Sequence, residues 1–252
     1  MKRFWINWGR WKLKVNPDGV QESKRNAALE AVKHVKEGFI LGLGSGSTAA
    51  FAIEALGERI KTEKLIILGI PTSYQAFLLA VDCGIPITTL DEHPKIDLTI
   101  DGADQITPEL NLIKGMGAAL AREKIVASAS KLNIIIADEK KKVNRLGENN
   151  QSVPIEVLPF AISLVKRKII EAGGKPIVRE SKGKLGPVIT DNGNVILDSC
   201  FGEISRPDEL EVKVKMIPGV IETGFFIGLT DIAYIGTGKA VGKIEKIKLN
   251  RL

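Results

Sequence analysis

Acidic side chains and a lysine gather between residues 97 and 124. The segment opens on DLTI, a short apolar strand, and Asp101 and Asp104 follow in DGAD, just past its carboxyl end, where open α/β sheets place their ligand clefts. Lys114 begins KGMG, whose flexible backbone lets successive N–H groups face an anion, and Glu123 lies on the helix predicted next. Proton transfer beside a carbonyl needs a base, a cation or donor for the oxyanion, and acids that carry hydroxyl protons. The segment therefore predicts acid–base chemistry.

Each of these residue types also has an ordinary structural role. An Asp-Gly pair usually forms a turn, and a helical glutamate flanked by Arg122 and Lys124 is usually solvated. The prediction rests on the combination, because one segment supplies every group that the chemistry requires.

A second segment, GLGSGSTAA, stands between an apolar strand and an amphipathic helix. Gly44 and Gly46 permit close backbone approach, and Ser45, Ser47 and Thr48 add hydroxyl donors at a helix N-terminus, where phosphates bind. The same letters fit the GxGxxA dinucleotide fingerprint, which demands an acidic residue at the end of the next strand. That strand, LIILGIPTS, ends in proline and hydroxyl residues instead. A phosphate site is favoured, and the two alternatives are an inert Gly-Ser turn and, less favoured, the dinucleotide site of a nicotinamide enzyme.

A series of motifs occurs along the chain in the order GLGSGSTAA, DLTIDGADQI, LIKGMGAALAREKIVA, IADEKKKVNRLG, PIEVLPFA, GPVITDNGNVILD and IPGVIETGFF. Together they resemble ribose-5-phosphate isomerase of the A type, from about residue 20 to residue 242. The resemblance implies an aldose–ketose isomerase that needs no cofactor and no metal. Such an enzyme interconverts D-ribose 5-phosphate and D-ribulose 5-phosphate through an enediolate, in the non-oxidative pentose phosphate pathway.

The resemblance also implies a role for each motif. Glu123 would be the base that moves a proton between C2 and C1. Asp101 and Asp104 would open the sugar ring and carry protons between O1 and O2, while Lys114 would face the oxyanion. The implied substrate-binding residues are Lys24, Ser45, Gly46, Ser47, Thr48, Gly102, Ala103, Gly115, Met116, Gly117 and Lys141.

Two positions depart from the family pattern. Ser45 stands where threonine is frequent, and Met116 stands where glycine is frequent, which reduces backbone freedom in that loop. In the IADEKKK motif, lysines flank Lys141 on both sides. The motif therefore leaves open whether Lys140 or Lys141 contacts the substrate.

Composition narrows the class of protein further. The chain of 252 residues is long enough for one large domain or two smaller ones. Cys83 and Cys200 lack metal-ligand spacing, which favours a reducing cytoplasm and disfavours zinc. The apolar runs are too short to span a membrane. The net charge is +6, but Lys and Glu alternate along most of the chain, so we expect no nucleic-acid partner. We expect a homodimer or homotetramer.

Segments of helical and strand-like pattern alternate in the first part of the chain, which predicts a doubly wound, largely parallel sheet. The expected helices are Glu22–Lys36, Ala49–Lys61, Tyr74–Cys83 and Ala118–Ser130, and the expected strands are Ile40–Leu43, Leu65–Ile70, Ile87–Thr89, Leu98–Ile100 and Asn133–Ala137. Later helices are expected over Val157–Gly173 and Pro207–Lys215, and later strands over Lys175–Arg179, Pro187–Thr190, Val195–Ser199, Gly224–Leu229 and Ala233–Gly236. The predicted division is an extension (1–20), a catalytic α/β domain (21–147 with 225–252) and a smaller α+β domain inserted before the C-terminal strands (148–224).

The first twenty residues have no counterpart in the family pattern. Residues 1–14 contain five Lys or Arg, no acid, and all three tryptophans of the chain, Trp5, Trp8 and Trp11. Contact with a membrane surface or with RNA is conceivable for such a segment. Exposed tryptophans are unfavourable on a protein in water, so we expect them to pack against the first domain or a neighbouring subunit.

Two other classes of protein share parts of this pattern. A sugar-phosphate sensor would keep the phosphate turn without needing a base, and it would carry a DNA-binding module. A coenzyme A transferase would use a glutamate on a similar fold as a nucleophile. Protection from heat by phosphosugar or by coenzyme A would distinguish the two ligand classes.

Overall fold

A six-stranded sheet organises the larger part of the computed structural model, which describes residues 19–181 and 183–246. The strand order is β15-β14-β6-β3-β1-β2. These strands are β1 (Ile40–Leu43), β2 (Leu68–Pro71), β3 (Leu98–Gly102), β6 (Asn133–Asp138), β14 (Ile232–Thr237) and β15 (Ala240–Glu245). Neighbours pair in parallel except β15, which returns antiparallel along β14. The tryptophan-rich segment of the sequence lies outside the described residues.

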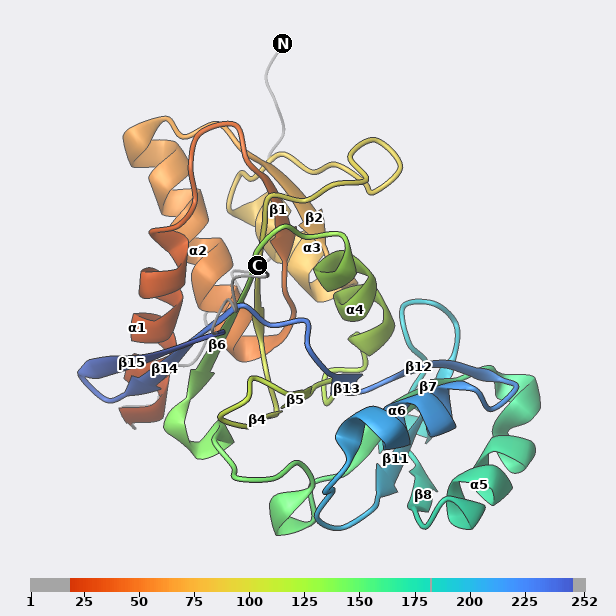
Figure 1. Cartoon of the computed structure of the whole chain (residues 1–252). Coiled ribbons are helices and arrows are strands. Elements are labelled where there is room, and N and C mark those ends of the chain that lie inside the picture. Colours follow the sequence, from red (N-terminus) through yellow and green to blue (C-terminus); the bar gives the residue numbers. More distant parts are fainter. Residues whose placement is uncertain (1–18, 182, 247–252) are drawn as a thin grey trace, which may run out of the picture.

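Helices cover both faces of this sheet (Figure 1). The helices are α1 (Gly19–Val32), α2 (Gly46–Glu63), α3 (Tyr74–Asp82) and α4 (Leu120–Ser128). Strand β6 shows why the sheet needs two covers, because all six of its residues are buried. Ile134 and Ile136 pack among side chains of α1, α2 and α3, whereas Ile135 and Ala137 face the opposite side with Leu120 of α4. A strand buried on both faces is typical of a doubly wound parallel sheet, which confirms the predicted fold class.

A separate four-stranded antiparallel sheet follows β6 and precedes β14 in the chain (Figure 1). Its order is β12-β7-β11-β8, from β7 (Val153–Val157), β8 (Lys175–Val178), β11 (Val195–Cys200) and β12 (Val220–Thr223). Helices α5 (Ile162–Glu171) and α6 (Pro207–Lys215) share an apolar core with it. The predicted boundaries at residues 147 and 224 stay a prediction, but the change from parallel to antiparallel pairing follows the predicted change in pattern.

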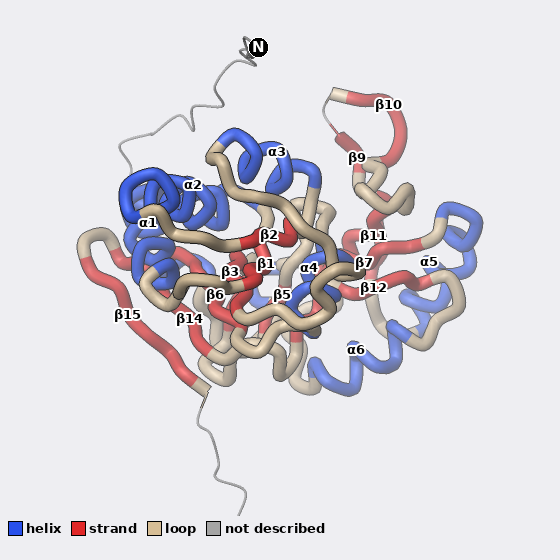
Figure 2. The backbone as a smooth tube through the Cα atoms, turned by 90° about the horizontal axis from the view of Figure 1, so that it is seen from above, coloured by secondary structure: helices blue, strands red, loops and turns tan. Residues whose placement is uncertain are grey.

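The remaining elements of the described residues are short. The strands β4 (Gln105–Ile106), β5 (Leu112–Ile113) and β13 (Phe225–Phe226) form a three-stranded sheet. The strands β9 (Glu180–Ser181) and β10 (Lys184–Pro187) form a hairpin that projects from the four-stranded antiparallel sheet, which we call the small sheet (Figure 2). Three short 3-10 helices complete the list: η1 (Glu139–Lys141), η2 (Glu148–Asn150) and η3 (Pro159–Ala161).

Several predicted elements differ in the structure. The strand expected over Ile87–Thr89 reduces to one bridge between Ile87 and Gly69. The helix expected from Val157 begins only at Ile162, because Val157 ends β7 and Pro159 starts a 3-10 turn. Strand β7 escaped prediction because proline and glutamate interrupt its apolar pattern.

Three strand predictions in the later part of the chain also differ from the structure. Of Gly224–Leu229, only Phe225 and Phe226 form a strand, and they pair with β5 rather than returning to the central sheet. Of Pro187–Thr190, Pro187 ends β10 and Ile189 makes a single bridge to Val195. Strand β15 was not predicted, because its Gly and Lys residues hide the strand pattern.

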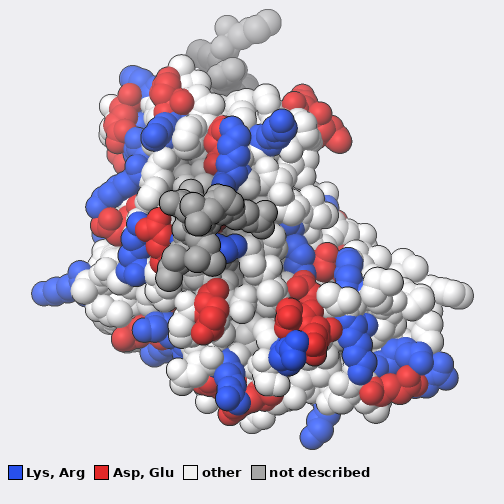
Figure 3. All heavy atoms as spheres, in the orientation of Figure 1, with Lys and Arg blue, Asp and Glu red and all other residues white. Residues whose placement is uncertain are grey.

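The outer surface carries mixed charge. On the face shown in Figure 3, Lys and Arg are interspersed with Asp and Glu rather than gathered into one basic area. Among the helices of the described ranges, none combines the length and apolar character that crossing a membrane requires.

Close packing of α1 on β14 yields a stability prediction. A Cβ added at Gly236 would lie 2.0 Å from the backbone oxygen of Ser23, so Gly236→Ala forces the helix away from the strand. We expect the free energy of unfolding, measured in urea, to fall by about 1–3 kcal/mol, which is the usual cost of overpacking a protein core. Gly19→Ala is the control, since nothing in the described residues lies within 4 Å of that added Cβ. Equal stability of both variants would contradict the predicted clash.

Candidate active site

A cleft lies at the carboxyl ends of β1 and β3, where parallel strands of an open sheet place ligands. It is lined by Lys24, Ser45, Gly46, Ser47, Thr48, Gly102, Ala103, Asp104, Lys114, Gly115, Gly117, Glu123 and Lys141. Every site residue predicted from the sequence is in this set except Asp101 and Met116. The structure therefore brings together residues that lie up to 117 positions apart in the chain.

The ammonium of Lys114 is the centre of the site. Its Nζ donates to the Gly102 carbonyl at 2.6 Å and lies 3.0 Å from Asp101 Oδ2 and 3.3 Å from Glu123 Oε1. All three charged side chains are buried, and the Phe226 ring lies 5.3 Å from Nζ. Burial opposes the charged amine, but the carboxylates of Asp101 and Glu123 outweigh it and raise the pKa of Lys114. Lys114 is therefore a permanent cation.

Asp101 is held on both of its oxygens. Oδ1 accepts the N–H groups of Ser45 at 3.1 Å and Gly102 at 2.7 Å, and Oδ2 faces Lys114. The turn after β1 passes so closely that a Cβ at Gly44 would lie 2.2 Å from Oδ1. Burial raises the pKa of Asp101, and Lys114 and the two N–H groups oppose that rise. Asp101 lies beneath the cleft, where it joins β3, the turn and the lysine.

Glu123 occupies the first turn of α4 with one oxygen unengaged. Oε1 faces Lys114, whereas Oε2 is buried and has no hydrogen-bond partner within the described residues. Burial raises the pKa of Glu123 to about 8, with Lys114 opposing the rise and Asp101 and Asp104 adding to it. A carboxylate with a pKa near neutrality is a stronger base than an ordinary glutamate and still deprotonates readily. Glu123 is thus suited to proton abstraction.

Asp104 and Met116 meet at the edge of the cleft. Oδ2 of Asp104 accepts the Met116 N–H at 2.9 Å, and no other hydrogen bond to this carboxylate occurs in the described ranges. Met116 is 47% exposed as a residue, and its sulfur lies 3.4 Å from the Gln151 amide, outside the residues that line the cleft. Met116 therefore contributes its backbone to the site.

The glycine-rich turn leads into α2 as predicted. Helix α2 begins at Gly46, and Lys24 of α1 donates to the Ser47 hydroxyl at 3.1 Å. The Ser45 hydroxyl instead joins a cluster with Thr72 and Ser73, at 2.7 and 2.6 Å. Ser47 and Lys24 thus meet at the cleft, whereas the Ser45 hydroxyl is already engaged.

Two further features of this region were not evident from the sequence. The N–H of Gly46 donates to the side chain of Gln75 at 2.8 Å, a contact across 29 positions that no local pattern signals. Among the three adjacent lysines, Lys141 lines the cleft, while Lys140 and Lys142 are exposed.

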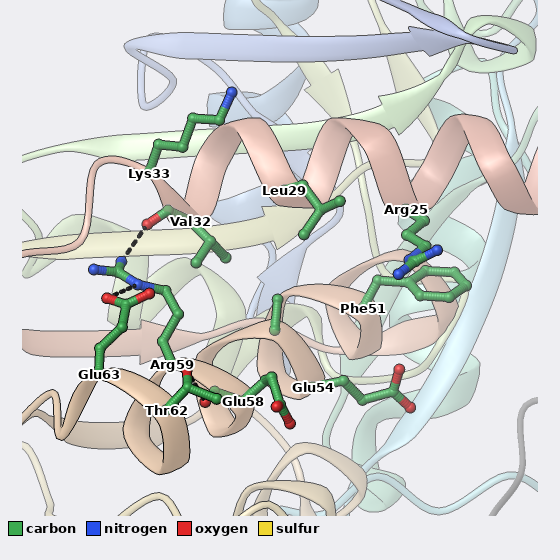
Figure 4. Close-up of a pocket in the computed structure, with 11 residues that line it drawn as sticks. Arg25, Leu29, Val32, Lys33, Phe51, Glu54, Glu58, Arg59, Thr62 and Glu63 are labelled. Atoms are coloured by element: carbon green, nitrogen blue, oxygen red, sulfur yellow. Dashed lines mark hydrogen bonds and ion pairs between the residues drawn. The ribbon is translucent and has the colours of Figure 1, made fainter.

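A larger hollow of about 760 Å³ lies between α1 and α2 (Figure 4). Arg59 crosses one end of it, donating to Glu63 at 2.9 Å and to the Val32 carbonyl at 3.0 Å. It holds no counterpart of the buried Lys114 and Glu123 pair, so size does not identify the chemical site. Within the described ranges, no three His, Cys, Asp or Glu side chains are grouped as metal ligands would be.

Comparison with known proteins gives consistent matches. Residues 68–240 match the family model described as ribose 5-phosphate isomerase A (phosphoriboisomerase A). A curated ribose-5-phosphate isomerase A from Methanosarcina acetivorans is 49% identical over 221 residues, which cover 88% of this chain and 93% of the relative.

Solved structures agree with those sequence matches. The ribose 5-phosphate isomerase A of Methanocaldococcus jannaschii is 44% identical with a TM-score of 0.86, over 90% of this chain and 99% of that one. A D-ribose-5-phosphate isomerase in complex with phospho-erythronic acid is 45% identical with a TM-score of 0.87, over the same shares of the two chains.

The charges around Glu123 predict that two substitutions shift its pKa in opposite directions. Asp104→Asn removes a negative charge and should lower the pKa of Glu123 from about 8. Lys114→Met removes the cation and should raise it further. Carbon-13 NMR of the carboxyl, assigned through Glu123→Gln, follows the titration directly. A midpoint near the ordinary 4.5 in the unmodified protein would contradict the burial effect.

Proposed function

The chain belongs to the ribose 5-phosphate isomerase A family of enzymes, and we propose that it interconverts D-ribose 5-phosphate and D-ribulose 5-phosphate through an enediolate. The observation that carries this proposal is the buried Glu123 carboxyl beside the Lys114 ammonium, in a cleft that also contains the Ser47 hydroxyl at a helix N-terminus. A base, a cation and an anion site are the parts that this isomerisation requires.

Glu123 acts first as base and then as acid. Its carboxylate takes the proton from C2 of the open-chain aldose, the C–H electron pair forms the C1–C2 double bond, and negative charge collects on O1. The same carboxyl then returns the proton to C1, the proton of the O2 hydroxyl passes to O1, and the C2=O bond forms, which yields the ketose. No electrons enter or leave the substrate, so the step needs no redox partner.

Lys114 stabilises the charge as it moves. In the free protein its Nζ faces Asp101, Glu123 and the Gly102 carbonyl. When Glu123 takes the proton it becomes neutral, and the ammonium that faced it is free to face the enediolate oxygen. The negative charge moves by a short distance within reach of one fixed cation, which limits the reorganisation that the transition state requires.

The two aspartates divide the remaining work. Asp104 lines the cleft, and its Oδ1 accepts no hydrogen bond from the described residues, so it can accept one from a sugar hydroxyl. It opens the ring and moves protons between O1 and O2. Asp101 lies below the cleft and serves as the fixed counter-ion of Lys114. This assignment differs from the paired role that the DGAD motif implies.

The phosphate binds at the start of α2, with Ser47, Thr48 and Lys24, and Lys141 faces the same cleft. The ligand of the solved relative, phospho-erythronic acid, carries a phosphate at one end and a planar carboxylate at the other. That carboxylate has the shape and charge of an enediolate. Such a ligand supports a site with two anion-binding ends, because remote phosphate contacts fix the reacting carbons beside the base.

Membership of this family sets aside the sensor and coenzyme A transferase interpretations. The substrate and product place the proposed reaction in the non-oxidative pentose phosphate pathway. The cytoplasmic location and the homodimer or homotetramer stay predictions.

Turnover of ribose 5-phosphate in the presence of EDTA tests the proposed activity and the base together. Glu123→Gln keeps the shape and removes basicity, so kcat should fall by ~10²–10⁴ with little change in KM. Glu58→Gln is the matched control, because Glu58 lines the larger hollow between α1 and α2. Near-normal turnover by Glu123→Gln, or an equal loss in Glu58→Gln, would exclude the assignment.

The phosphate end is tested by comparing ribose 5-phosphate with free ribose. Thr48→Val removes a hydroxyl donor to a charged group, so binding of the phosphosugar should weaken by roughly ten- to a hundredfold, while binding of free ribose should hardly change. Thr62→Val, in the last turn of the same helix, controls for effects on the helix. Equal weakening of both ligands by Thr48→Val would place the phosphate elsewhere.

A further inference from the structure

The backbone loop that follows Lys114 is held from outside the cleft by a residue of the small sheet. We call residues 114–117 the KGMG loop. Arg179, which follows β8, donates from one terminal nitrogen to the carbonyls of Gly115 and Met116, both at 2.9 Å. The contacts cross 64 and 63 positions of the chain. They join the antiparallel sheet to the loop that carries the catalytic lysine.

Arg179 is itself fixed in place. Its Nε donates to Asp198 Oδ2 at 2.8 Å, and its other terminal nitrogen donates to Asp198 Oδ1, so the pair is bidentate. The arginine side chain is 11% exposed. Its backbone N–H donates to Ile196 of the neighbouring strand at 2.9 Å, and its carbonyl accepts from Val188 at 2.8 Å. The guanidinium therefore has one orientation, with its remaining face on the KGMG loop.

The carbonyl contacts determine where the loop N–H groups point. In a trans peptide the C=O and the next N–H point in opposite directions. Holding the Gly115 carbonyl on Arg179 turns the Met116 N–H toward Asp104, which accepts it at 2.9 Å. Holding the Met116 carbonyl likewise turns the Gly117 N–H away from Arg179, and Gly117 lines the cleft.

The loop needs such an external tie because its conformation is unusual. Gly115 has φ +100° and Ala118 has φ +60°, and the turn within the loop is closed by one hydrogen bond, from Ala118 N–H to the Gly115 carbonyl at 2.9 Å. A non-glycine residue in the left-handed region persists when surrounding contacts determine it. Arg179 adds two contacts just before Ala118, at the carbonyls of Gly115 and Met116.

We propose that Arg179, oriented by Asp198, is a positioning residue for the isomerase reaction: it fixes the KGMG loop so that the Met116 and Gly117 N–H groups stay on the substrate side. The inference rests on the proposed function for its kinetic consequence. The side chain acts through the loop and does not contact the substrate. An arginine is required because only its planar fork pairs with a carboxylate through two nitrogens while a third donates elsewhere.

The kinetic test uses Arg179→Lys and Asp198→Asn in the full chain, with Arg167→Lys on α5 as the matched control. Arg167 is an exposed arginine that pairs only with Glu171 in the described residues. We expect kcat for ribose 5-phosphate to fall by roughly ten- to a hundredfold in both test variants, because small misplacements of positioning groups cost about that much. KM should change by less than about threefold, since the phosphate end is untouched.

Hydrogen exchange supplies a readout that needs no substrate. The Met116 and Gly117 amides should exchange faster in Arg179→Lys and Asp198→Asn than in the unmodified protein, while amides of β8 and β11 keep their protection. Unchanged exchange of the loop amides in a folded test variant would overturn the proposal, whatever its kcat. If Arg179→Lys fails to fold, Asp198→Asn decides the same comparison.

The two proposals fail in different ways. If the unmodified protein does not turn over ribose 5-phosphate, the proposed function is wrong, and the exchange comparison still decides whether Arg179 holds the loop. If the unmodified protein is active and both test variants keep kcat within about twofold, while Glu123→Gln is inactive, the positioning role is wrong and the proposed function stands.

Discussion

The buried ammonium of Lys114 is the interaction on which the rest of the cleft depends. It links Asp101 and the Gly102 carbonyl at the end of β3 to Glu123 in α4. Removing one partner of a buried ion pair costs about 3–5 kcal/mol, because the other charge is left without compensation. One cation between two carboxylates also leaves a surplus of negative charge in a buried place. The charges of Asp101 and Asp104 add to burial in raising the pKa of Glu123, while Lys114 opposes that rise. The charges that hold the site together therefore also set the basicity of Glu123.

The small antiparallel sheet takes part in this arrangement from the outside. Lys124, next to the proposed base, donates to Glu211 of α6 at 2.7 Å and to Glu222 of β12 at 2.9 Å. These contacts fix the rotation of α4 about its axis, so that Glu123 faces the cleft while Lys124 faces α6 and β12. Arg179 holds the KGMG loop in the same manner. The central sheet therefore supplies the cleft, and the small sheet restrains the two elements that carry its base and its cation.

Among the hydroxyl groups at the start of α2, some face the cleft and one holds the turn in place. Ser45, Ser47 and Thr48 all line the cleft, but the Ser45 hydroxyl is engaged by Thr72 and Ser73 at the end of β2. The residues that end β2 in place of a ribose-binding acid thus stabilise the turn. A turn held by side chains beneath it keeps its helix N-terminus ready for an anion, and this preorganisation lowers the cost of binding.

The sequence by itself determined the fold class and the order of most elements, because apolar periodicity and glycine turns are local features. Its charged and glycine-rich motifs, together with their resemblance to a known family, indicated the residues of the cleft. It did not predict β7 or β15, whose residues lack a clear alternation. Only the tertiary structure decided that Asp101 lies beneath the cleft, that Met116 offers its backbone, and that Arg179 holds the loop. Those outcomes depend on which distant strands pair and on which side chains become buried. Burial and long-range hydrogen bonds arise only when the chain is folded, so no local spacing encodes them.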